Sequence, residues 1–427
     1  MTTMTQGQGQ QEYIRQGAGG PSHPARICYF LKKYPTISET FLVNEMVELQ
    51  RQGIHITIVA KKDSGLTVVH EKVKALQAPI CYLPSSSELG ASAWSARAVA
   101  TYGAEATTLD KDALRGELTT DEHATLIQAG LISPYLKTLG IRHIHAHFAT
   151  WAATAVSYVS RMTGIPYSFT AHARDIYHQK VDPRGLAEKI AGAKFVITVS
   201  DFNKRFLEDL LHSQGMSGTV IRLYNGIDLD QFQSEPSEKE PNLIVSVGRL
   251  VPKKGFHYLL EACRLLKEQG VPFHCAIIGE GDERHNLEAQ IGQHALDKDI
   301  TLLGAKTQAE VKKLIQRATV FVLPCIVDDN GDRDGLPTVL LEAMALGTPV
   351  ISTRVTGIPE IIEHGKTGCL VEGKESRELA QTIQELLGSE SRRTRLSAAA
   401  LAKVRQDFDV TTNVSRLKEY FLTSCAP

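Results

Sequence analysis

The stretch DRDGLPTVLLEAMALGTPV, residues 332–350, carries the local pattern that decides the fold. Short apolar runs lie before it, at residues 320–323 (VFVL), and at its end, at residues 350–353 (VIST), and they predict buried strands. Residues 338–346 between them are mostly strong helix formers, and the Gly and Pro that follow predict the end of a helix. This order of strand, loop, helix and strand is one unit of a parallel sheet.

The loop before this helix combines the features of an anion site with two carboxylates. Pro337 suits the first helical position, and the loop should lie at the carboxyl end of its strand, where open α/β sheets bind ligands. Free N–H groups at a helix N-terminus favour an anion. Two carboxylates lie nearby: Asp334 at the helix start, and Glu342 one turn beyond Thr338 on the same face. Both can accept hydrogen bonds from hydroxyl groups. A site for phosphate and hydroxyls together suggests a sugar nucleotide.

The composition excludes several classes of protein. At 427 residues the chain is long enough for two or three domains, and its formal net charge of -1 does not favour a nucleic-acid partner. The seven cysteines are scattered and form no C-x-x-C, which argues for a reducing cytosol and against disulfides or structural zinc. No apolar run is long enough to predict a transmembrane helix. Residues 1–24 lack the apolar core of a signal peptide and are expected to form a disordered tail.

Two series of short apolar runs, separated by gaps of helix length, predict an α/β protein with two doubly wound parallel sheets facing a cleft. We predict an N-terminal domain over residues 25–229, a polar linker over 230–242, a second domain over 243–408, and a last helix within 409–427 that packs toward the first domain. Residues 85–138 predict helices without a clear period. The expected strands are residues 26–31, 55–60, 80–83, 141–147, 167–172, 195–200 and 220–224 in the first series, and 243–247, 273–278, 300–303, 320–323, 350–353 and 368–371 in the second.

A second loop carries two positive charges. The segment GRLVPKKG, residues 248–255, follows the expected strand LIVSV and precedes a helix. Arg249 supplies a planar fork and Lys254 a point charge, so the two could hold a pair of phosphates. The alternative is that both are solvated loop charges, as most Lys and Arg side chains are.

Four motifs of the second domain, in order, resemble family 4 of the retaining glycosyltransferases, which have the GT-B fold of two Rossmann-like domains. They are GRLxxKKG at 248–255, IIGEGDE at 277–283, DGLPxxxxEAMAxGxPVI at 334–351 and GIPEIIEHGxTG at 357–368. Motifs of the first domain resemble the subgroup that builds exopolysaccharides, including colanic-acid-type polymers. They are YPTISETF at 34–41, HIHAHFA at 143–149, FTAHAxDI at 169–176 and VSxFN at 199–203. The resemblance covers about residues 26–423.

The resemblance implies that the second domain binds a nucleotide-sugar donor. Arg249 and Lys254 match the family's pair on the donor diphosphate, and Glu342 matches the glutamate that binds the ribose hydroxyls. Asp334 stands where the family usually has another glutamate, near the donor sugar. Aspartate is one methylene shorter than glutamate and keeps its charge, so we expect the difference to affect the preference for the donor sugar more than the activity. The resemblance places further residues against the donor: Gly248, Leu303, Gly304, Gly335, Leu336, Pro337 and Thr338.

The first domain supplies a candidate histidine. His172 matches a family histidine at the end of a strand, which implies contact with the donor sugar; the alternative is a histidine hydrogen-bonded within the core. Asp175 either orients this region or caps the helix that begins after it.

Three histidines, His143, His145 and His147, alternate along one expected strand and therefore face one side. A metal site needs further ligands, and no carboxylate or cysteine is paired with them in the sequence, so we expect no metal. His147, at the strand end, is expected to line the acceptor side of the cleft.

Other motifs are weaker. Ser38 and Glu39 lie in the family's acceptor-side loop, but Thr36 and Glu39 also have the spacing of a capping box. The acidic loop 328–335 lacks the glycine and glutamate positions of an EF-hand, so calcium is not expected. The G-x-G at 279–281 stands alone, and no G-x-G-x-x-G follows the first strand, so NAD is not expected either.

The resemblance implies a retaining hexosyltransferase without a cofactor, because no D-x-D metal motif serves the diphosphate in the GT-B fold and two cations replace the metal. The expected donor is a UDP-hexose or, as second choice, GDP-mannose, and the expected acceptor is a saccharide or lipid-linked saccharide hydroxyl. We expect a cytoplasmic enzyme, with possible peripheral contact to the inner face of the plasma membrane through the first domain. Two alternatives stay open: a catalytically inactive GT-B scaffold subunit, supported only by Asp334, and a GT-B sugar-nucleotide epimerase.

Overall fold

The computed structural model describes residues 25–36, 40–66, 71–84, 120–233 and 238–425. The expected N-terminal tail, the acceptor-side candidates Ser38 and Glu39, and residues 234–237 of the proposed linker lie outside this part of the chain. None of the described helices is both long and apolar enough to cross a membrane.

The first domain is built on a parallel seven-stranded sheet with the order β3-β2-β1-β4-β5-β6-β7. Its short strands are mostly buried on both faces, which is typical of parallel sheets covered by helices. The strands are β1 (Arg26–Leu31), β2 (His55–Ala60), β3 (Ile80–Tyr82), β4 (His143–His147), β5 (Tyr167–Ala171), β6 (Phe195–Thr198) and β7 (Val220–Arg222). The helices are α1 (Thr40–Arg51), α2 (Glu71–Ala75), α4 (Thr120–Thr138), α5 (Trp151–Thr163), α6 (Arg174–Tyr177), α7 (Pro183–Gly192) and α8 (Asp201–Ser213).

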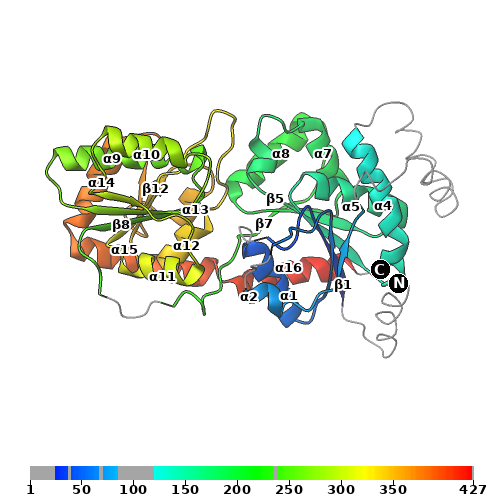
Figure 1. Ribbon diagram of the computed structural model, residues 1–427. Helices are drawn as coiled ribbons and strands as arrows, with labels where there is room; N and C mark the ends of the chain where they lie inside the picture. Colours follow the sequence, from blue (N-terminus) through cyan, green and yellow to red (C-terminus); the bar gives the residue numbers. More distant parts are fainter. Residues whose placement is uncertain (1–24, 37–39, 67–70, 85–119, 234–237, 426–427) are drawn as a thin grey trace, which may run out of the picture.

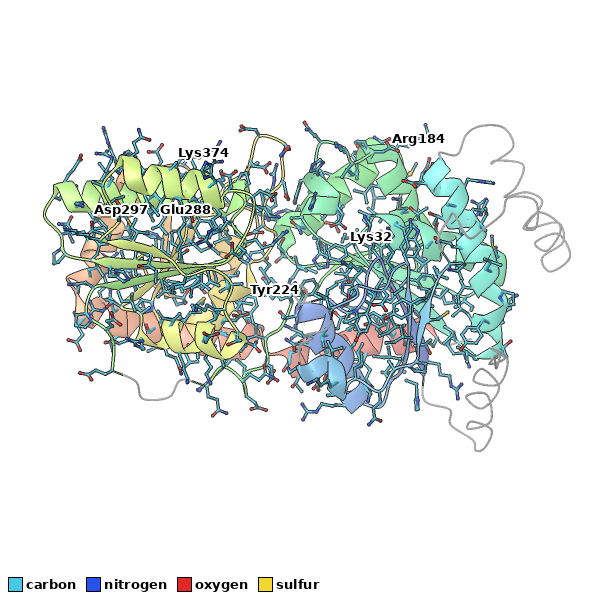
Figure 2. All side chains as sticks on the ribbon, viewed as in Figure 1. Lys32, Arg184, Tyr224, Glu288, Asp297 and Lys374 are labelled. Carbon is cyan, nitrogen blue, oxygen red and sulfur yellow. The ribbon has the colours of Figure 1, made fainter. Side chains whose placement is uncertain are left out.

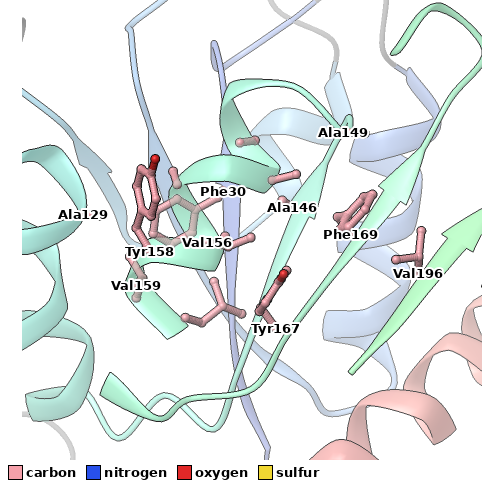
Figure 3. Packing of buried hydrophobic residues seen from close by; sticks show 14 of the residues in the cluster. Phe30, Ala129, Ala146, Ala149, Val156, Tyr158, Val159, Tyr167, Phe169 and Val196 are labelled. Carbon is pink, nitrogen blue, oxygen red and sulfur yellow. The ribbon is translucent and has the colours of Figure 1, made fainter. Parts of the chain in front are cut away.

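Separate apolar clusters cover the two faces of this sheet. On one face, residues of α4, α5, α7 and α8 form a cluster with Phe30, Ala146 and Phe169. Figure 3 shows these three residues together with Val156 of α5. On the other, α1 buries Leu42 and Met46, which lie one turn apart. The last helix of the chain, α16 (Val410–Ser424), lies beside α1 on this second face (Figure 1). The predicted return of the C-terminal helix to the first domain is therefore confirmed.

The second domain is built on a parallel six-stranded sheet with the order β10-β9-β8-β11-β12-β13. One face packs against α9, α10 and α14, and the other packs against α11, α12 and α15 (Figure 1). The strands are β8 (Leu243–Val247), β9 (His274–Ile278), β10 (Ile300–Leu302), β11 (Val320–Leu323), β12 (Val350–Thr353) and β13 (Cys369–Val371). The helices are η2 (Pro252–Lys254), α9 (Phe256–Glu268), α10 (Arg284–Gln293), α11 (Gln308–Arg317), α12 (Thr338–Ala345), α13 (Ile358–Ile361), α14 (Ser376–Leu387) and α15 (Glu390–Asp407).

The helix of the opening stretch differs from its prediction by one residue. Pro337 is the N-cap of α12 and not its first helical residue, because its ψ of 104° is extended rather than helical. At the other end, Gly347 has a φ of +71° just past the C-cap, as the pattern predicted. The strands before and after this helix have the predicted bounds.

Candidate active site between the two domains

Two loops of the second domain meet where its strand order reverses. Residues 248–255 follow β8 and residues 324–337 follow β11, and these neighbouring strands carry their connections to opposite sides of the sheet. Such a switch point is where open α/β sheets bind ligands. The loops approach so closely that a Cβ added at Gly255, which has a φ of +70°, would lie 1.9 Å from the carbonyl oxygen of Pro324. Glycine is therefore required at this position.

Lys254, the predicted phosphate-binding lysine, forms an ion pair with Asp334, the acid that stands where the family usually has a glutamate. Lys254 Nζ lies 2.6 Å from Asp334 Oδ2. A neighbour that the sequence reading missed, Lys253, lies 3.5 Å from Asp334 and 3.1 Å from Asp332. The thiol of Cys325 donates to the same Asp334 oxygen over 3.3 Å. The loop after β11 is thus held by two lysines from the loop after β8.

This pair fixes the charges of its members. Burial by itself would raise the pKa of Asp334, but Lys254 and Lys253 outweigh it and lower the pKa to about 2. Burial would lower the pKa of Lys254, but Asp334 and then Cys325 raise it above its ordinary value. Both groups are therefore charged across the physiological pH range.

The other two predicted donor groups are unpaired. Arg249 is exposed, and among the described residues its guanidinium has no hydrogen-bond or ion-pair partner. Glu342 is half-buried in α12, and within the same part of the chain its carboxyl group also has none. Burial raises the pKa of Glu342 to about 7. Buried polar groups ordinarily have partners, so Glu342 is suited to receive hydroxyl donors from a ligand.

The N-terminus of α12 is open as well. Pro337 provides no side-chain cap, and the backbone N–H of Thr338 has no acceptor among the residues that the structure describes. Leu336 is buried beneath the loop and fixes its path. This helix end therefore offers a backbone donor to an anion.

Leu303 and Gly304, which are predicted to lie against the donor, follow β10. Leu303 N donates to Ile277 O over 2.8 Å, and Gly304 O accepts from Gly279 N over 2.9 Å. Gly304, with a φ of +71°, leaves only 2.9 Å between an added Cβ and a carboxylate oxygen of Glu280. These hydrogen bonds tie the segment to β9, and it lies at the same sheet edge as the lysine loop.

The donor loop touches the first domain beside His172. A Cβ added at Gly335 would lie 3.3 Å from the Cβ of Ala173 and 3.5 Å from Asn203 Nδ2. A Cβ added at Gly357 would lie 2.7 Å from the Cβ of Ser200. These contacts place the candidate site at the interface between the domains.

A carboxylate from the second domain also caps a helix of the first. Glu360 of α13 accepts hydrogen bonds from the N–H groups of Asp201, over 2.8 Å, and Phe202, over 3.0 Å, at the start of α8. It also accepts from the hydroxyl of Tyr224 over 3.1 Å, and Figure 2 shows Tyr224 where the domains meet. The sequence reading missed Glu360, because its partners lie about 140 to 160 positions away.

The predicted residues His172 and His147 lie together at the carboxyl ends of β5 and β4. His147 Nδ1 is 3.4 Å from His172 Nε2, and His147 Nε2 is 3.0 Å from a carboxylate oxygen of Glu45, on α1. The same oxygen of Glu45 accepts from the Tyr29 hydroxyl over 2.7 Å. Burial, followed by the charge of His147, lowers the pKa of His172 to about 3, so His172 is neutral.

Asp175 does not cap the following helix. It lies inside α6, whose N-cap is Ala173, and its carboxylate accepts from the backbone N–H of His172 over 3.0 Å and from that of Ala149 over 2.5 Å. The N-cap alternative is therefore wrong, because the carboxylate turns back to the ends of β4 and β5. Burial raises the pKa of Asp175 to about 6, although backbone N–H donors, including those of Ala149 and His172, and the charge of Lys189 oppose this.

The three alternating histidines share a face, as predicted, but they divide into two groups. His145 bonds through both ring nitrogens, to Ser168 over 2.8 Å and to Thr170 over 3.1 Å, and burial lowers its pKa. His143 bonds to Ser168 over 2.6 Å and to Ser424 of α16 over 2.7 Å. These two are core histidines with hydroxyl partners.

The fold adds a carboxylate to this cluster that the sequence pattern did not reveal. Atoms of Glu45, His145 and His147 that can bind metal lie within 4.8 Å of one another. Each of these ring nitrogens already has a hydrogen-bond partner, so a metal ion would have to displace those bonds. The cluster is better described as a hydrogen-bond network.

A separate cavity of about 720 Å³ lies on the second domain, between α9, the start of α14 and the acidic loop 328–329. His257, Glu261 and Arg377 are among its lining residues. None of the predicted site residues lines it.

The fold matches that of solved GT-B glycosyltransferases. The crystal structure of Anabaena HepE in complex with UDP-glucose has a TM-score of 0.70 and 17% identity, and it covers 93% of this chain and 99% of its own. A sucrose-phosphate synthase from Thermosynechococcus elongatus has a TM-score of 0.72 and 16% identity, with 93% and 98% covered. These likenesses define the class of fold, which is GT-B as predicted.

The family follows from the sequence. Residues 228–403 match the model of glycosyl transferases group 1. WcaL of Salmonella typhimurium, named as a colanic acid biosynthesis glycosyltransferase, is 32% identical over 372 residues, covering 84% of this chain and 90% of that protein. The amylovoran biosynthesis glycosyltransferase AmsK of Erwinia amylovora is 28% identical over 405 residues, covering 90% and 96%. The chain belongs to the group 1 glycosyl transferases and is a glycosyltransferase.

Proposed function

We propose that this protein is a retaining glycosyltransferase that moves a hexose from a nucleotide diphosphate sugar to a hydroxyl group of a saccharide or lipid-linked saccharide in exopolysaccharide synthesis. The observation that supports it most is the meeting, at one switch point, of Lys254, the unpaired Glu342 and the open N-terminus of α12. This combination suits a diphosphate joined to a ribose.

Each group has a separate task in donor binding. The diphosphate lies between Lys254, the exposed Arg249 and the N–H groups at Thr338. The unpaired carboxylate of Glu342 accepts hydrogen bonds from the ribose hydroxyl groups. Asp334 holds the ammonium group of Lys254 at 2.6 Å, so an arriving phosphate shares this lysine with Asp334 or takes its place. The base lies along the backbone at Leu303 and Gly304.

The reaction is one of charge separation. As the bond between the sugar and the diphosphate breaks, negative charge builds on the phosphate oxygens, where two cations and a helix N-terminus already stand. Retention of configuration requires attack on the face that the diphosphate leaves, so its oxygen takes the acceptor proton. The pairing of Lys254 with Asp334 keeps the lysine charged for this step. His172, from the other domain, contacts the sugar.

The names of the relatives support our choice of donor and acceptor. WcaL and AmsK are named for colanic acid and amylovoran biosynthesis, and HepE was crystallised with UDP-glucose. A GDP-mannose-dependent mannosyltransferase of Mycobacterium tuberculosis is 28% identical over 217 residues, but only 48% of this chain is covered. We therefore propose a UDP-hexose as the first choice of donor and GDP-mannose as the second. We also propose that the enzyme acts at the cytoplasmic side of the membrane that carries the acceptor.

Incubation of the purified protein with UDP-glucose, UDP-galactose and GDP-mannose, with and without saccharide acceptors, tests this function. We expect nucleotide diphosphate release that an acceptor accelerates, and an axial bond in the product when the donor bond is axial, as read by proton NMR. Interconversion of the donor sugar without an acceptor would instead identify an epimerase. Binding without turnover under every condition would identify an inactive subunit.

A further inference from the structure

A chain of polar side chains runs from the covered side of the first domain to the candidate site. The Tyr29 hydroxyl and His147 Nε2 both meet one oxygen of Glu45, at 2.7 and 3.0 Å. His147 Nδ1 then meets His172 Nε2 at 3.4 Å, with the two rings 25° from parallel. Tyr29 lies within β1, His147 ends β4 and His172 follows β5, so the sheet holds three of the four residues in place.

The direction of each proton follows from the first member of the chain. Burial raises the pKa of Tyr29 well above its ordinary value, so its hydroxyl keeps its proton and donates it to Glu45. A carboxylate only accepts, so the proton between Glu45 and His147 belongs to Nε2 of His147. With a single ring proton, on Nε2, His147 has a bare Nδ1, which accepts from the Nε2–H of His172 over 3.4 Å.

His172 has a single proton to place, because it is neutral. With that proton on Nε2, its Nδ1 is bare and can only accept a hydrogen bond. This nitrogen has no partner among the described residues, and the next residue, Ala173, lies against Gly335 of the donor loop. A donor sugar held at that loop presents hydroxyl groups.

We propose that Glu45 and His147 are positioning residues that hold His172 in its Nε2–H tautomer, so that its Nδ1 accepts a hydrogen bond from a hydroxyl group of the donor sugar. The ligand part of this inference rests on the proposed function, whereas the tautomer does not. The opposite polarity, with His147 as an imidazolium, would place a donating N–H on His172 Nδ1 and favour a carbonyl or carboxylate group instead.

The tautomer can be read without any substrate. In protein labelled with ¹⁵N-histidine, long-range proton–nitrogen NMR correlations distinguish a bare nitrogen from a protonated one, and His172→Gln assigns the signals. We expect a bare Nδ1 and a protonated Nε2 in the native protein and in Glu45→Gln, whose amide oxygen still accepts. In Glu45→Met we expect a mixture of tautomers, and the matched control Glu48→Met, on the same helix with Arg51 and Gln52 as partners, should leave the native pattern. A protonated Nδ1 in the native protein would overturn the inference.

Donor analogues test the second half. On the donor that the protein uses, Glu45→Met should lower kcat/KM about tenfold, the size expected for one hydrogen bond, and Glu45→Gln should restore most of it. Removal of the contacted hydroxyl from the donor should cost the native protein a similar factor and Glu45→Met almost nothing more. If the losses in kcat/KM from Glu45→Met and from removal of a hydroxyl group were additive for every deoxy donor, the contact between His172 and the sugar would be contradicted. If no donor is turned over at all, the proposed function fails while the tautomer result stands.

Discussion

At the scale of single residues, Glu342 shows most directly how the fold tunes the site. Its carboxyl group lies in α12 without a partner among the described residues, and burial raises its pKa from 4.5 to about 7. The folded protein therefore holds this proton more tightly than the unfolded chain does. The resulting loss of stability is absent below pH 4.5, grows between pH 4.5 and 7, and is complete above pH 7.

Replacement of Glu342 by glutamine should therefore separate stability from function. Glu342→Gln removes a buried charge, so above pH 7 it should be more stable than the native protein, by at most about 3 kcal/mol for such a pKa shift. At pH 5 the difference should be much smaller. Thermal unfolding at pH 5 and 8 measures this, with the exposed Glu372→Gln as control. Equal stability of the two proteins at pH 8 would show that the pKa of Glu342 is not raised. Whether or not stability changes, Glu342→Gln should bind the donor more weakly.

Lys254 should matter for chemistry more than for folding. Lys254→Ala removes one of the charges that stabilise the leaving diphosphate, so turnover should fall about a hundredfold or more. Lys253, at 3.5 Å, remains to balance Asp334, so the fold should persist. Steady-state kinetics and circular dichroism check both points, and the exposed Lys313→Ala serves as control. Native turnover in Lys254→Ala would remove this lysine from the site.

At the scale of elements, the two domains are joined by a helix cap that crosses between them. Glu360 of α13 caps the N-terminus of α8 with two hydrogen bonds, and a negative charge is favoured at that end of a helix. The cap holds the end of α8 against the segment that carries Gly357, next to the donor loop.

Loss of this cap should open the molecule. Glu360→Ala should increase the radius of gyration in small-angle X-ray scattering without ligand and raise the KM for the donor severalfold, because closure no longer gains these bonds. Glu363→Ala is the matched control, since Glu363 pairs with Lys366 and Lys403 inside the second domain. An unchanged radius and KM in Glu360→Ala would show that closure does not depend on the cap.

The sequence predicted these elements unevenly. The strands 26–31, 55–60 and 243–247 have the predicted bounds, because buried parallel strands are short continuous apolar runs. The predicted strand 141–147 begins only at His143, since apolar character alone does not show where pairing with β1 starts. The helices α14 and α15 are separated only by Gly388 and Ser389.

At the scale of the whole molecule, the end of the chain completes the first domain. Phe421 and Leu417 of α16 are fully buried in the cluster with Tyr29, Leu42 and Met46. Gln52, the residue after α1, also donates to Thr411 O and accepts from the Ser415 hydroxyl. The α16 helix, at the end of the chain, thus covers the same face of the first sheet as α1, near its start.

The helix should therefore stabilise a domain that lies far away in sequence. Phe421→Ala should cost about 3–5 kcal/mol, as large core truncations do. Hydrogen exchange followed by mass spectrometry should show faster exchange in β1 and β4, with β8 and β9 nearly unchanged. The neighbouring Leu422→Ala, whose side chain is exposed, should change neither sheet. Faster exchange confined to the second domain would contradict this assignment.

The site residues were predictable only in part. Lys254, Glu342 and His172 stand out because they occur in local motifs that resemble a family. Glu45 and Glu360 carry no such signal, since the former acts through α1 on β4 and the latter acts across the domain interface. Contacts of this kind arise from the packing of elements, so they become visible only in three dimensions.

The most direct test of the central claim, that the second domain holds a nucleotide-sugar donor through Lys254 and Glu342, is a thermal-unfolding panel without added metal. UDP, GDP, ADP and their common sugar conjugates would be compared on the native protein, Lys254→Ala and Glu342→Ala, because a ligand that binds only the folded state raises its unfolding temperature. We predict a clear rise in the unfolding temperature with one base, which both substitutions abolish. No rise with any nucleotide, or a rise that survives both substitutions, would contradict it.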